Sequence, residues 1–375
     1  MKKFYLIALM ILSVSMNLES KPADSNYWND LARYFGGMPI REESPLKPAT
    51  KQQYYKDHMV YMDQFWEKVS KETVAVIVPW RKENVPQNLS KNPAFYPFSG
   101  ADLVNFYTMF PNAPYYIMMA LEDPGHIPDP LALKDHELKY GFTAFKNAID
   151  TIASMNYFHS RKMYDHMSNR YFTGTLPTIL AFAARLNLTI NDIEAVGLDS
   201  KGNVQKLDDK GMLEGIKPRV TGNRITFKGE NDYSPRTLLY LKMRLASSAL
   251  DEKTPEGKFF NRLPNYNFMT KSAIYLLHRK GFEPLCNYFL EKSEIIIQDD
   301  SGIPYKYFVN DNWERKLYGV YTFPTKIMDL DHTPHQPDLT AAYKEKSIPF
   351  PFRYGYGVLR AKNNSNLMMM IKKKK

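Results

Sequence analysis

The stretch AFYPFSGADLVNFYTMFPNAPYYIMMALED, residues 94–123, carries the clearest indication of a fold. Residues 94–98 form an aromatic run of strand character, and residues 115–121 form a continuous apolar run that ends at Glu122. Between them, apolar residues recur at helical spacing from Leu103 to Phe110. We therefore expect strand, helix and strand, with a second strand that is apolar on both faces, as in a parallel sheet covered by helices.

Other segments extend this pattern to an α/β fold. Helices are expected over residues 26–75, 135–167, 175–186 and 266–290, the last with a break at Gly281. Strands are expected over residues 193–198, 224–228, 237–244 and 294–298. These elements predict a central, largely parallel or mixed sheet with flanking helices, an N-terminal helical extension and Tyr- and Pro-rich C-terminal loops.

The expected organisation is a signal peptide at 1–20, a helical extension at 21–90, an α/β domain at 91–360 and a disordered basic tail at 361–375. Met1-Lys-Lys precedes the apolar run Phe4–Leu12, and cleavage is expected after Ser15 or Ser20. No apolar run reaches the ~20 residues of a membrane span. We expect an exported protein, periplasmic or secreted, with no transmembrane segment.

The charge of the chain does not indicate a nucleic-acid-binding protein. The 375 residues carry a formal net charge of +10, but the leader and the tail hold much of it, and 43 basic and 39 acidic residues remain between them. No basic stripe with interleaved aromatic residues is present. Weak contact with an anionic surface is expected through Lys372, Lys373, Lys374 and Lys375. The single cysteine, Cys286, excludes an internal disulfide.

The first candidate site lies in the βαβ segment. Ser99 and Asp102 have the spacing of a capping box at a helix N-terminus. In doubly wound sheets the helix after the first strand receives an anionic group, and an acidic residue that ends the second strand binds a ribose. Glu122 would be that acidic residue. However, Gly100 alone replaces the three glycines of G-x-G-x-x-G, and the capping box explains Ser99 and Asp102 without a ligand.

The second candidate site is the string Asp299-Asp300-Ser301-Gly302-Ile303-Pro304-Tyr305, which has a strong turn signal. Asp299 and Asp300 are adjacent, so their side chains point to opposite sides of an extended chain and do not form a ready acid/base pair. One carboxylate could bind a cation or ligand hydroxyls, Ser301 lies beside them, and Tyr305 could offer an aromatic surface to a sugar. A plain turn explains the string equally.

No other motif identifies a reaction. His332 and His335 form a His-x-x-His pair among carboxylates, a weak metal candidate because two prolines make the segment a loop. The sequence lacks G-x-S-x-G, the P-loop and a catalytic cysteine signature. No cofactor can be named from these residues, and they do not decide whether the chain is an enzyme.

Several strings resemble a family of exported bacterial proteins of uncharacterised function. They are Phe95–Asp102, Phe110–Asn112, Tyr115–Glu122, Lys271–His278, Ile297–Tyr305 and Gln336–Tyr343. Phe-Ser-Gly-x-Asp and Gln-Asp-Asp-Ser-Gly-Ile-Pro are the most specific of them, and the resemblance spans roughly residues 28–357. It implies export and one domain, and it transfers no catalytic residue.

Three functions follow as hypotheses. The first is an exported protein that binds a polar ligand or a partner. The second is a hydrolase or transferase that acts on a sugar- or nucleotide-like substrate through Asp299, Asp300 and Glu122. The third is an interaction protein of the cell surface that uses its basic tail and aromatic loops.

Overall fold

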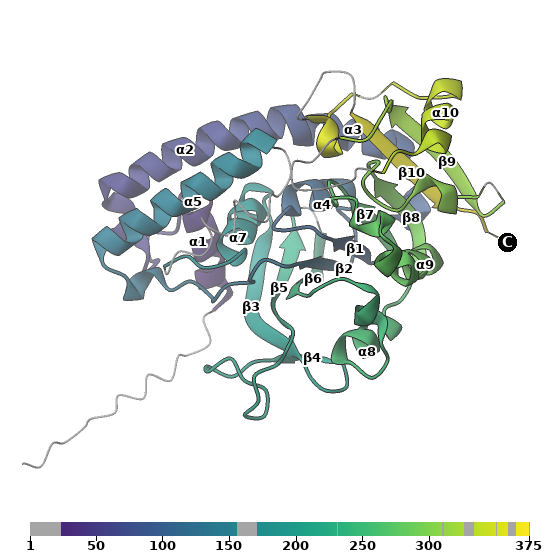
Figure 1. Cartoon of the computed structure of the whole chain (residues 1–375). Coiled ribbons are helices and arrows are strands. Elements are labelled where there is room, and N and C mark those ends of the chain that lie inside the picture. Colours follow the sequence, from purple (N-terminus) through teal and green to yellow (C-terminus); the bar gives the residue numbers. More distant parts are fainter. Residues whose placement is uncertain are drawn as a thin grey trace, which may run out of the picture.

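A computed structural model describes residues 24–155, 171–230, 232–309, 311–325, 334–349, 351–358 and 365–374 (Figure 1). The expected signal peptide at 1–20 lies outside these ranges. The helices are α1 (Ser25–Phe35), α2 (Gln53–Val69), α3 (Ala75–Asn84), α4 (Leu103–Met109), α5 (Asp135–Met155), α7 (Leu176–Arg185), α8 (Pro255–Asn261), α9 (Glu283–Lys292) and α10 (Pro337–Glu345). The strands are β1 (Ala94–Pro97), β2 (Tyr115–Ala120), β3 (Thr189–Leu198), β4 (Val204–Lys206), β5 (Thr221–Gly229), β6 (Asp232–Lys242), β7 (Tyr266–Thr270), β8 (Ser293–Gln298), β9 (Trp313–Gly319) and β10 (Asn366–Lys372).

The described strands form one ten-stranded mixed sheet in the order β4-β3-β5-β6-β2-β1-β7-β8-β10-β9. The five central strands, β6, β2, β1, β7 and β8, are parallel. Antiparallel strands complete both sides, with β5, β3 and β4 beyond β6 and with β10 and β9 beyond β8. The α/β fold expected from the sequence is therefore confirmed.

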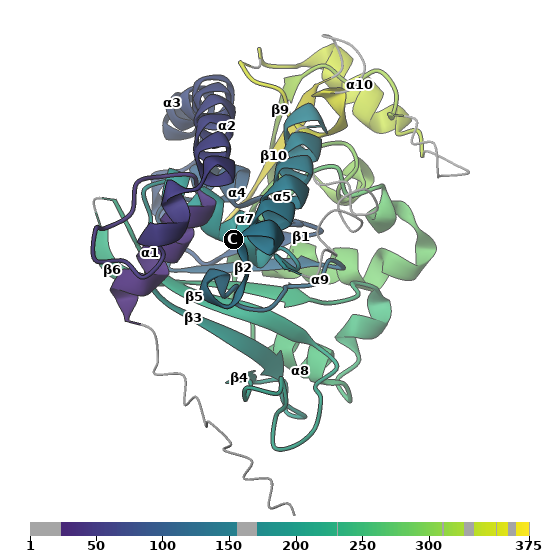
Figure 2. The same cartoon turned by 90° about the vertical axis from the view of Figure 1, so that its left-hand side faces the viewer.

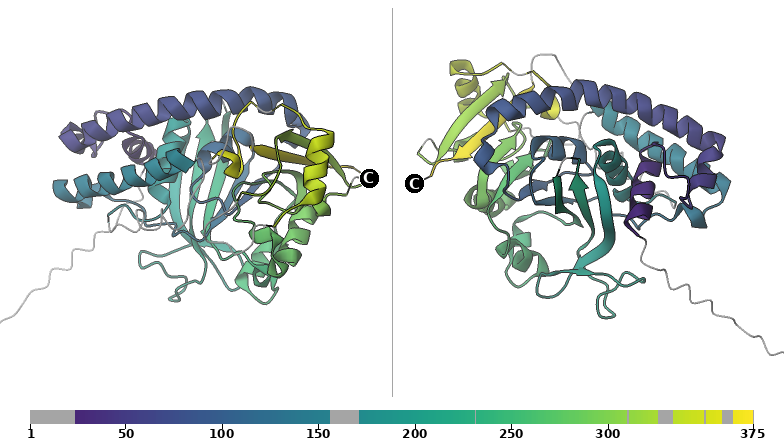
Figure 3. Two further views of the ribbon diagram at one scale, coloured as in Figure 1. Left: turned by 45° about the horizontal axis from the view of Figure 1, so that its top comes forward. Right: turned by 180° about the vertical axis from the view of Figure 1, so that it is seen from behind.

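Helices cover both faces of the sheet, and successive strand residues alternate between the two cores. Tyr96 and Met118 pack into the core under α1, α2, α3, α4, α5 and α7, whereas Phe95 and Ile117 pack into the core under α8, α9 and α10. Figure 2 shows α2 and α5 on one side of the sheet and α8 on the other. Figure 3 shows α2 and α5 running alongside each other across the first face. The helices of residues 21–90 thus form part of one core layer.

The βαβ unit predicted from residues 94–123 is present. β1 and β2 are parallel neighbours, with Ala94 opposite Tyr116 and Tyr96 opposite Met118, and α4 connects them. All of β1 and most of β2 are buried, as expected for strands covered on both faces.

Two expectations for the C-terminal third are wrong. Residues 266–270 were expected to be helical, but they form the central strand β7, in which all five residues are buried. The tail from 361 was expected to be disordered, but Asn366–Lys372 forms β10 between β8 and β9. The apolar side chains of Leu367–Met370 fill both cores, which explains why this segment is ordered.

The end of β10 is also held by contacts outside the sheet. The ammonium group of Lys372 donates to the carbonyl of Glu291 in α9, and the backbone N–H of Lys373 donates to the carbonyl of Asn312. Among the described residues, no helix combines the length and the hydropathy that crossing a bilayer requires.

The buried position of β10 predicts a large cost for shortening one of its side chains. Met369 is 0% exposed and lies in the core, so Met369→Ala should reduce the free energy of unfolding by about 2–5 kcal/mol. Lys374 is exposed and lies just after β10, so Lys374→Ala should leave the free energy of unfolding nearly unchanged. Urea unfolding of the two variants measures the difference. Equal stabilities would show that β10 does not belong to the core.

Candidate functional site

The carboxyl ends of β1 and β7 meet at the centre of the sheet. From β1 the chain passes through α4 to β2 on one side, whereas β7 pairs with β1 on the other side and leads through α9 to β8. Because these connections leave in opposite directions, β1 and β7 enclose the switch point at which doubly wound sheets bind ligands. The two turns at this place are residues 98–102 and 271–275.

Backbone strain concentrates in these two turns. Among the described residues, six that are not glycine have a positive φ, and four of them lie here: Phe98 at 58°, Ser272 at 54°, Ile274 at 52° and Tyr275 at 50°. A side chain at such an angle costs free energy and persists only where neighbouring contacts hold it. The contacts that hold these turns come from a buried polar network.

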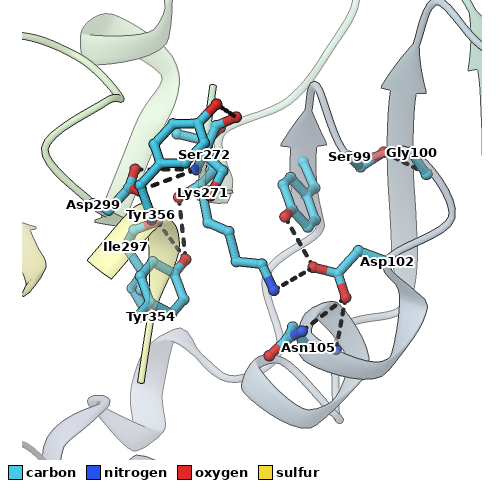
Figure 4. Close-up of polar contacts among 12 residues, drawn as sticks. Ser99, Gly100, Asp102, Asn105, Lys271, Ser272, Ile297, Asp299, Tyr354 and Tyr356 are labelled. Atoms are coloured by element: carbon cyan, nitrogen blue, oxygen red, sulfur yellow. Dashed lines mark hydrogen bonds and ion pairs between the residues drawn. The ribbon is translucent and has the colours of Figure 1, made fainter. Parts of the chain in front are cut away.

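A buried ion pair forms the centre of this network. The ammonium group of Lys271 lies 3.0 Å from Asp102 Oδ2, and the side chains are 2% and 6% exposed. The hydroxyl of Tyr96 donates to the same oxygen over 3.0 Å. The side-chain amide of Asn105 donates to Oδ1 over 2.8 Å, and its backbone N–H donates to the same atom. Figure 4 shows Lys271 extending from the β7 turn to Asp102 at the start of α4.

The expected capping box is wrong in detail. The N-cap of α4 is Asp102, which accepts a hydrogen bond from the N–H of Asn105, and the helix begins at Leu103. Ser99 lies one turn earlier, is 1% exposed, and its hydroxyl donates to the carbonyl of Gly100. The positive φ of Phe98 and of Gly100 (52°) keeps residues 98–100 out of the helix.

Asp299 holds three segments together. Its carboxylate accepts hydrogen bonds from the N–H of Ser272 over 3.1 Å, from the N–H of Tyr356 over 3.2 Å and from the hydroxyl of Ser301 over 2.6 Å. The neighbouring Gly355 has φ 62°, and a Cβ there would lie 1.9 Å from Asp299 Oδ2, so only glycine fits. Figure 4 shows Asp299, Ser272 and Tyr356 in one group beside Lys271.

Asp300 is also held by hydrogen bonds, with a different set of partners. The hydroxyl of Tyr275 donates to Oδ2 over 2.6 Å, and the amide of Asn366 in β10 donates to Oδ1 over 2.9 Å. The N–H of Asp300 in turn donates to Asn366 Oδ1 over 2.8 Å. Asp299 and Asp300 are 0% and 2% exposed. Both carboxylates of the second candidate site therefore stabilise turns and strands.

Burial raises the pKa of both carboxyl groups. The pKa of Asp300 rises from 3.8 to about 7, first because the group is desolvated and second because Asp299 lies beside it. Burial also raises the pKa of Asp299, against hydrogen bonds that favour its charged form. The folded chain thus binds a proton at Asp300 more tightly than the unfolded chain does.

The remaining predicted residues of this segment are also engaged. The hydroxyl of Ser301 accepts from the N–H of Ala273 over 2.8 Å. Tyr305 is 6% exposed and the Arg315 guanidinium lies 5.0 Å from its ring centre, so the ring is not an open surface for a sugar.

The metal candidate gains no support from the structure. His335 is exposed and its ring lies 3.4 Å from the Thr340 hydroxyl, while His332 lies outside the described residues. Within the described ranges, no three His, Cys, Asp or Glu side chains are arranged to hold a metal ion.

Glu122 differs from all these carboxylates. It follows β2 and is 5% exposed, and both of its carboxylate oxygens are buried without a hydrogen-bond partner. Its backbone carbonyl accepts from the hydroxyl of Tyr240 in β6 over 3.0 Å. Nearby, the amide of Asn223 donates to the carbonyl of Pro124 over 2.9 Å, which leaves Asn223 Oδ1 buried and without a partner. The backbone at Glu122 and Pro124 is thus bound to β6 and β5, and the Glu122 carboxylate makes no hydrogen bond to the switch-point network.

Glu122 also lines a broad open groove with a volume of about 1980 Å³. The groove lies between the start of α1, residues 122–131, residues 173–174 and residues 206–222. The backbone around Glu122 is fixed, because the N–H of Thr175 donates to the carbonyl of Asp123 over 2.9 Å. A Cβ at Gly125, which has φ 82°, would lie 1.8 Å from the Thr173 carbonyl.

The structure therefore brings Ser99, Asp102, Asp299, Asp300 and Ser301 to the switch point and places Glu122 apart from them. The sequence analysis missed Lys271, Asn105, Tyr275 and Asn366. Lys271 was hidden because the strand before it was interpreted as helix, and Asn366 because it was assigned to a disordered tail. The signal that could have identified Lys271 is its place directly after a short apolar run.

Comparison with known proteins gives no relative. No family model, no curated protein and no solved structure matches the chain. The resemblance to exported bacterial proteins stays a prediction.

The buried ion pair predicts non-additive effects of mutation. Lys271→Met leaves the Asp102 charge buried without its counter-ion and should reduce the free energy of unfolding by about 3–5 kcal/mol. The double variant with Asp102→Asn should lose less than the sum of the two single changes. Denaturant unfolding of the four proteins measures the coupling, and Lys280→Met on the surface is the control. Additive losses would contradict the pair.

The raised pKa of Asp300 predicts a pH dependence of stability. Between pH 3.8 and about 7 the folded state holds a proton at this carboxyl group that the unfolded state has released, so stability falls as pH rises through this window. Relative to Asp300→Asn, the wild-type unfolding free energy should fall by up to about 1.4 kcal/mol per pH unit and level off above pH 7. Asp311→Asn, at an exposed position, should keep the wild-type profile. Parallel profiles of wild type and Asp300→Asn would refute the assignment.

Proposed function

We propose that the protein is an exported binding protein for a nucleoside- or sugar-like ligand whose hydroxyl groups bind Glu122. The observation that carries the proposal is the state of this carboxylate, which is buried and lacks any hydrogen-bond partner within the described chain while it lines a groove. Export rests on the leader sequence Met1–Ser20 alone.

The sheet topology supports this position. Counted from β1, the parallel strands have the order 3-2-1-4-5, in which β6, β2, β1, β7 and β8 take these places. Dinucleotide-binding sheets begin with the same order and use an acidic residue about 20 residues after the first turn to bind the ribose hydroxyls. Glu122 follows the second strand at that distance from the turn at Ser99. This is an analogy of topology and position, and it concerns no other residue of the site.

The energetics support it as well. A buried carboxyl group without hydrogen-bond partners costs free energy, and native proteins rarely keep such a group without a use. Two vicinal hydroxyl groups would donate to the two oxygens of Glu122. Binding would then offset a cost that the free protein already carries.

The alternative of a hydrolase or transferase that uses Asp299 and Asp300 has less support. Its strongest point is the pKa of Asp300 near 7, which suits proton transfer. However, both carboxylates are saturated with hydrogen bonds that hold the turns in place. Glu122 has no hydrogen bond to either of them, and its backbone is bound to Tyr240 in β6. Weak binding to anionic surfaces through the C-terminal lysines remains a further proposal, reduced by the engagement of Lys372 in the fold.

Ligand-induced thermal shifts test the proposal. Adenosine, uridine, methyl glucoside and NAD are titrated into the wild type and into Glu122→Gln. The matched control is Glu67→Gln, at an exposed position of α2. We expect a nucleoside or the glucoside to raise the Tm of the wild type and of the control, and the shift to be lost in Glu122→Gln. Without ligand, Glu122→Gln should be as stable as the wild type or more stable by about 1 kcal/mol, because it replaces a buried carboxyl group that has no hydrogen-bond partner.

That second readout separates loss of binding from loss of folding. If all the compounds leave the wild-type Tm unchanged, or if Glu122→Gln keeps the full shift, Glu122 is not the binding residue.

A further inference from the structure

We infer that the ligand bound at Glu122 is a nucleoside without phosphate groups and that it carries a positively charged substituent, such as an ammonium or sulfonium group, in the acidic groove. This inference rests on the proposed function and narrows its ligand class. It follows from three features, which are the occupied start of α4, the charge of the groove and the acceptor character of its buried atoms.

The turn after β1 cannot receive a phosphate. In nucleotide-binding sheets the N–H groups at the start of the first helix bind the pyrophosphate. Here the Asp102 carboxylate already accepts from the N–H of Asn105 and occupies that place. A phosphate would meet this negative charge, and Lys271 is already engaged as its counter-ion. The turn is thus closed to anions by its own residues.

The groove itself is acidic although the chain is basic. Carboxylates outnumber basic side chains in its lining by nine to four. Ion pairs neutralise groups of both signs, because Arg41 pairs with Asp30, Glu194 pairs with Lys206 and Arg224, and Asp123 pairs with Lys242. Most of the remaining charged side chains in the lining are carboxylates. Glu43 and Asp209 are exposed acidic side chains of the lining. The field in the groove therefore favours cations and disfavours phosphates.

The buried oxygens of Glu122 make the same selection. Both are acceptors without a partner in the described chain. They require donors, which hydroxyl and ammonium groups supply and an ionised phosphate does not. The open groove, with a volume of about 1980 Å³, leaves room for a substituent on the nucleoside.

A matched series of three nucleosides tests the preference for a positively charged substituent. Adenosine, AMP and 5′-amino-5′-deoxyadenosine differ only at the 5′ position, which is neutral, negative or positive. Titration calorimetry at 25 mM and 300 mM NaCl should give the tightest binding for the amine and the weakest for AMP, by about tenfold or more between them. The higher salt concentration should weaken the binding of the amine and leave the binding of adenosine nearly unchanged.

A variant of the groove provides the second arm. The double variant Glu43→Gln, Asp209→Asn should weaken the amine about two- to fivefold and leave adenosine unchanged, because each exposed charge contributes little. The control, Glu67→Gln with Asp311→Asn, removes two exposed carboxylates outside the groove lining and should change neither. Tighter binding of AMP than of the amine, or no effect of the groove variant, overturns the inference.

Spermidine and pyrophosphate separate this inference from the proposed function. Spermidine should raise the Tm of the wild type in low salt, less so for the groove variant, while pyrophosphate should not. If spermidine binds in this way, and both the whole nucleoside series and methyl glucoside fail, the proposed function is wrong and the cationic preference stands. If pyrophosphate stabilises the protein and spermidine does not, the cationic preference is wrong whatever the nucleosides do.

Discussion

The ion pair between Lys271 and Asp102 is the constraint on which the carboxyl edge of this sheet depends. Lys271 leaves β7 and Asp102 begins α4, so the pair links the two connections that run in opposite directions from the sheet centre. Removing either partner would cost several kcal/mol, because both charges are buried. The turns therefore have one arrangement, and the strained angles of Phe98 and Ser272 are held by it.

The network around this pair also explains why several attractive polar residues are not an open site. Asp299 binds the N–H next to Lys271, and Asp300 binds Tyr275 from the same turn and Asn366 from β10. Each carboxylate thus connects strands that are distant in the sequence. A group with that task has its lone pairs occupied, whereas a ligand needs lone pairs that are free. Burial and perturbed pKa alone do not separate the two cases, but hydrogen-bond saturation does.

The sequence could predict those parts of the fold that depend on local periodicity. Residues 94–123 contain both an apolar strand and a helical repeat, so β1, α4 and β2 were found, and Glu122 was placed at a strand end. β7 was missed because Tyr266–Thr270 is short and buried on both faces, and such a run lacks the alternation that marks a half-buried strand. β10 was missed because four lysines after a run of methionines are typical of a solvated tail. The partners of Asp102 and Asp300 could not be predicted, since Lys271 and Asn366 reach them only through the order of strands in the sheet.

The two sides of β1 therefore carry different roles. On the β7 side, Lys271 pairs with Asp102, and Asp299 and Asp300 accept hydrogen bonds from the turn at residues 271–275. On the far side of β2, Glu122 lines the groove and has two buried carboxylate oxygens without a partner in the described chain. A sheet that pairs its charges so completely at one strand end would gain stability by doing the same at the next. Because a buried carboxyl group without partners costs stability, we propose that Glu122 is kept for binding and not for structure.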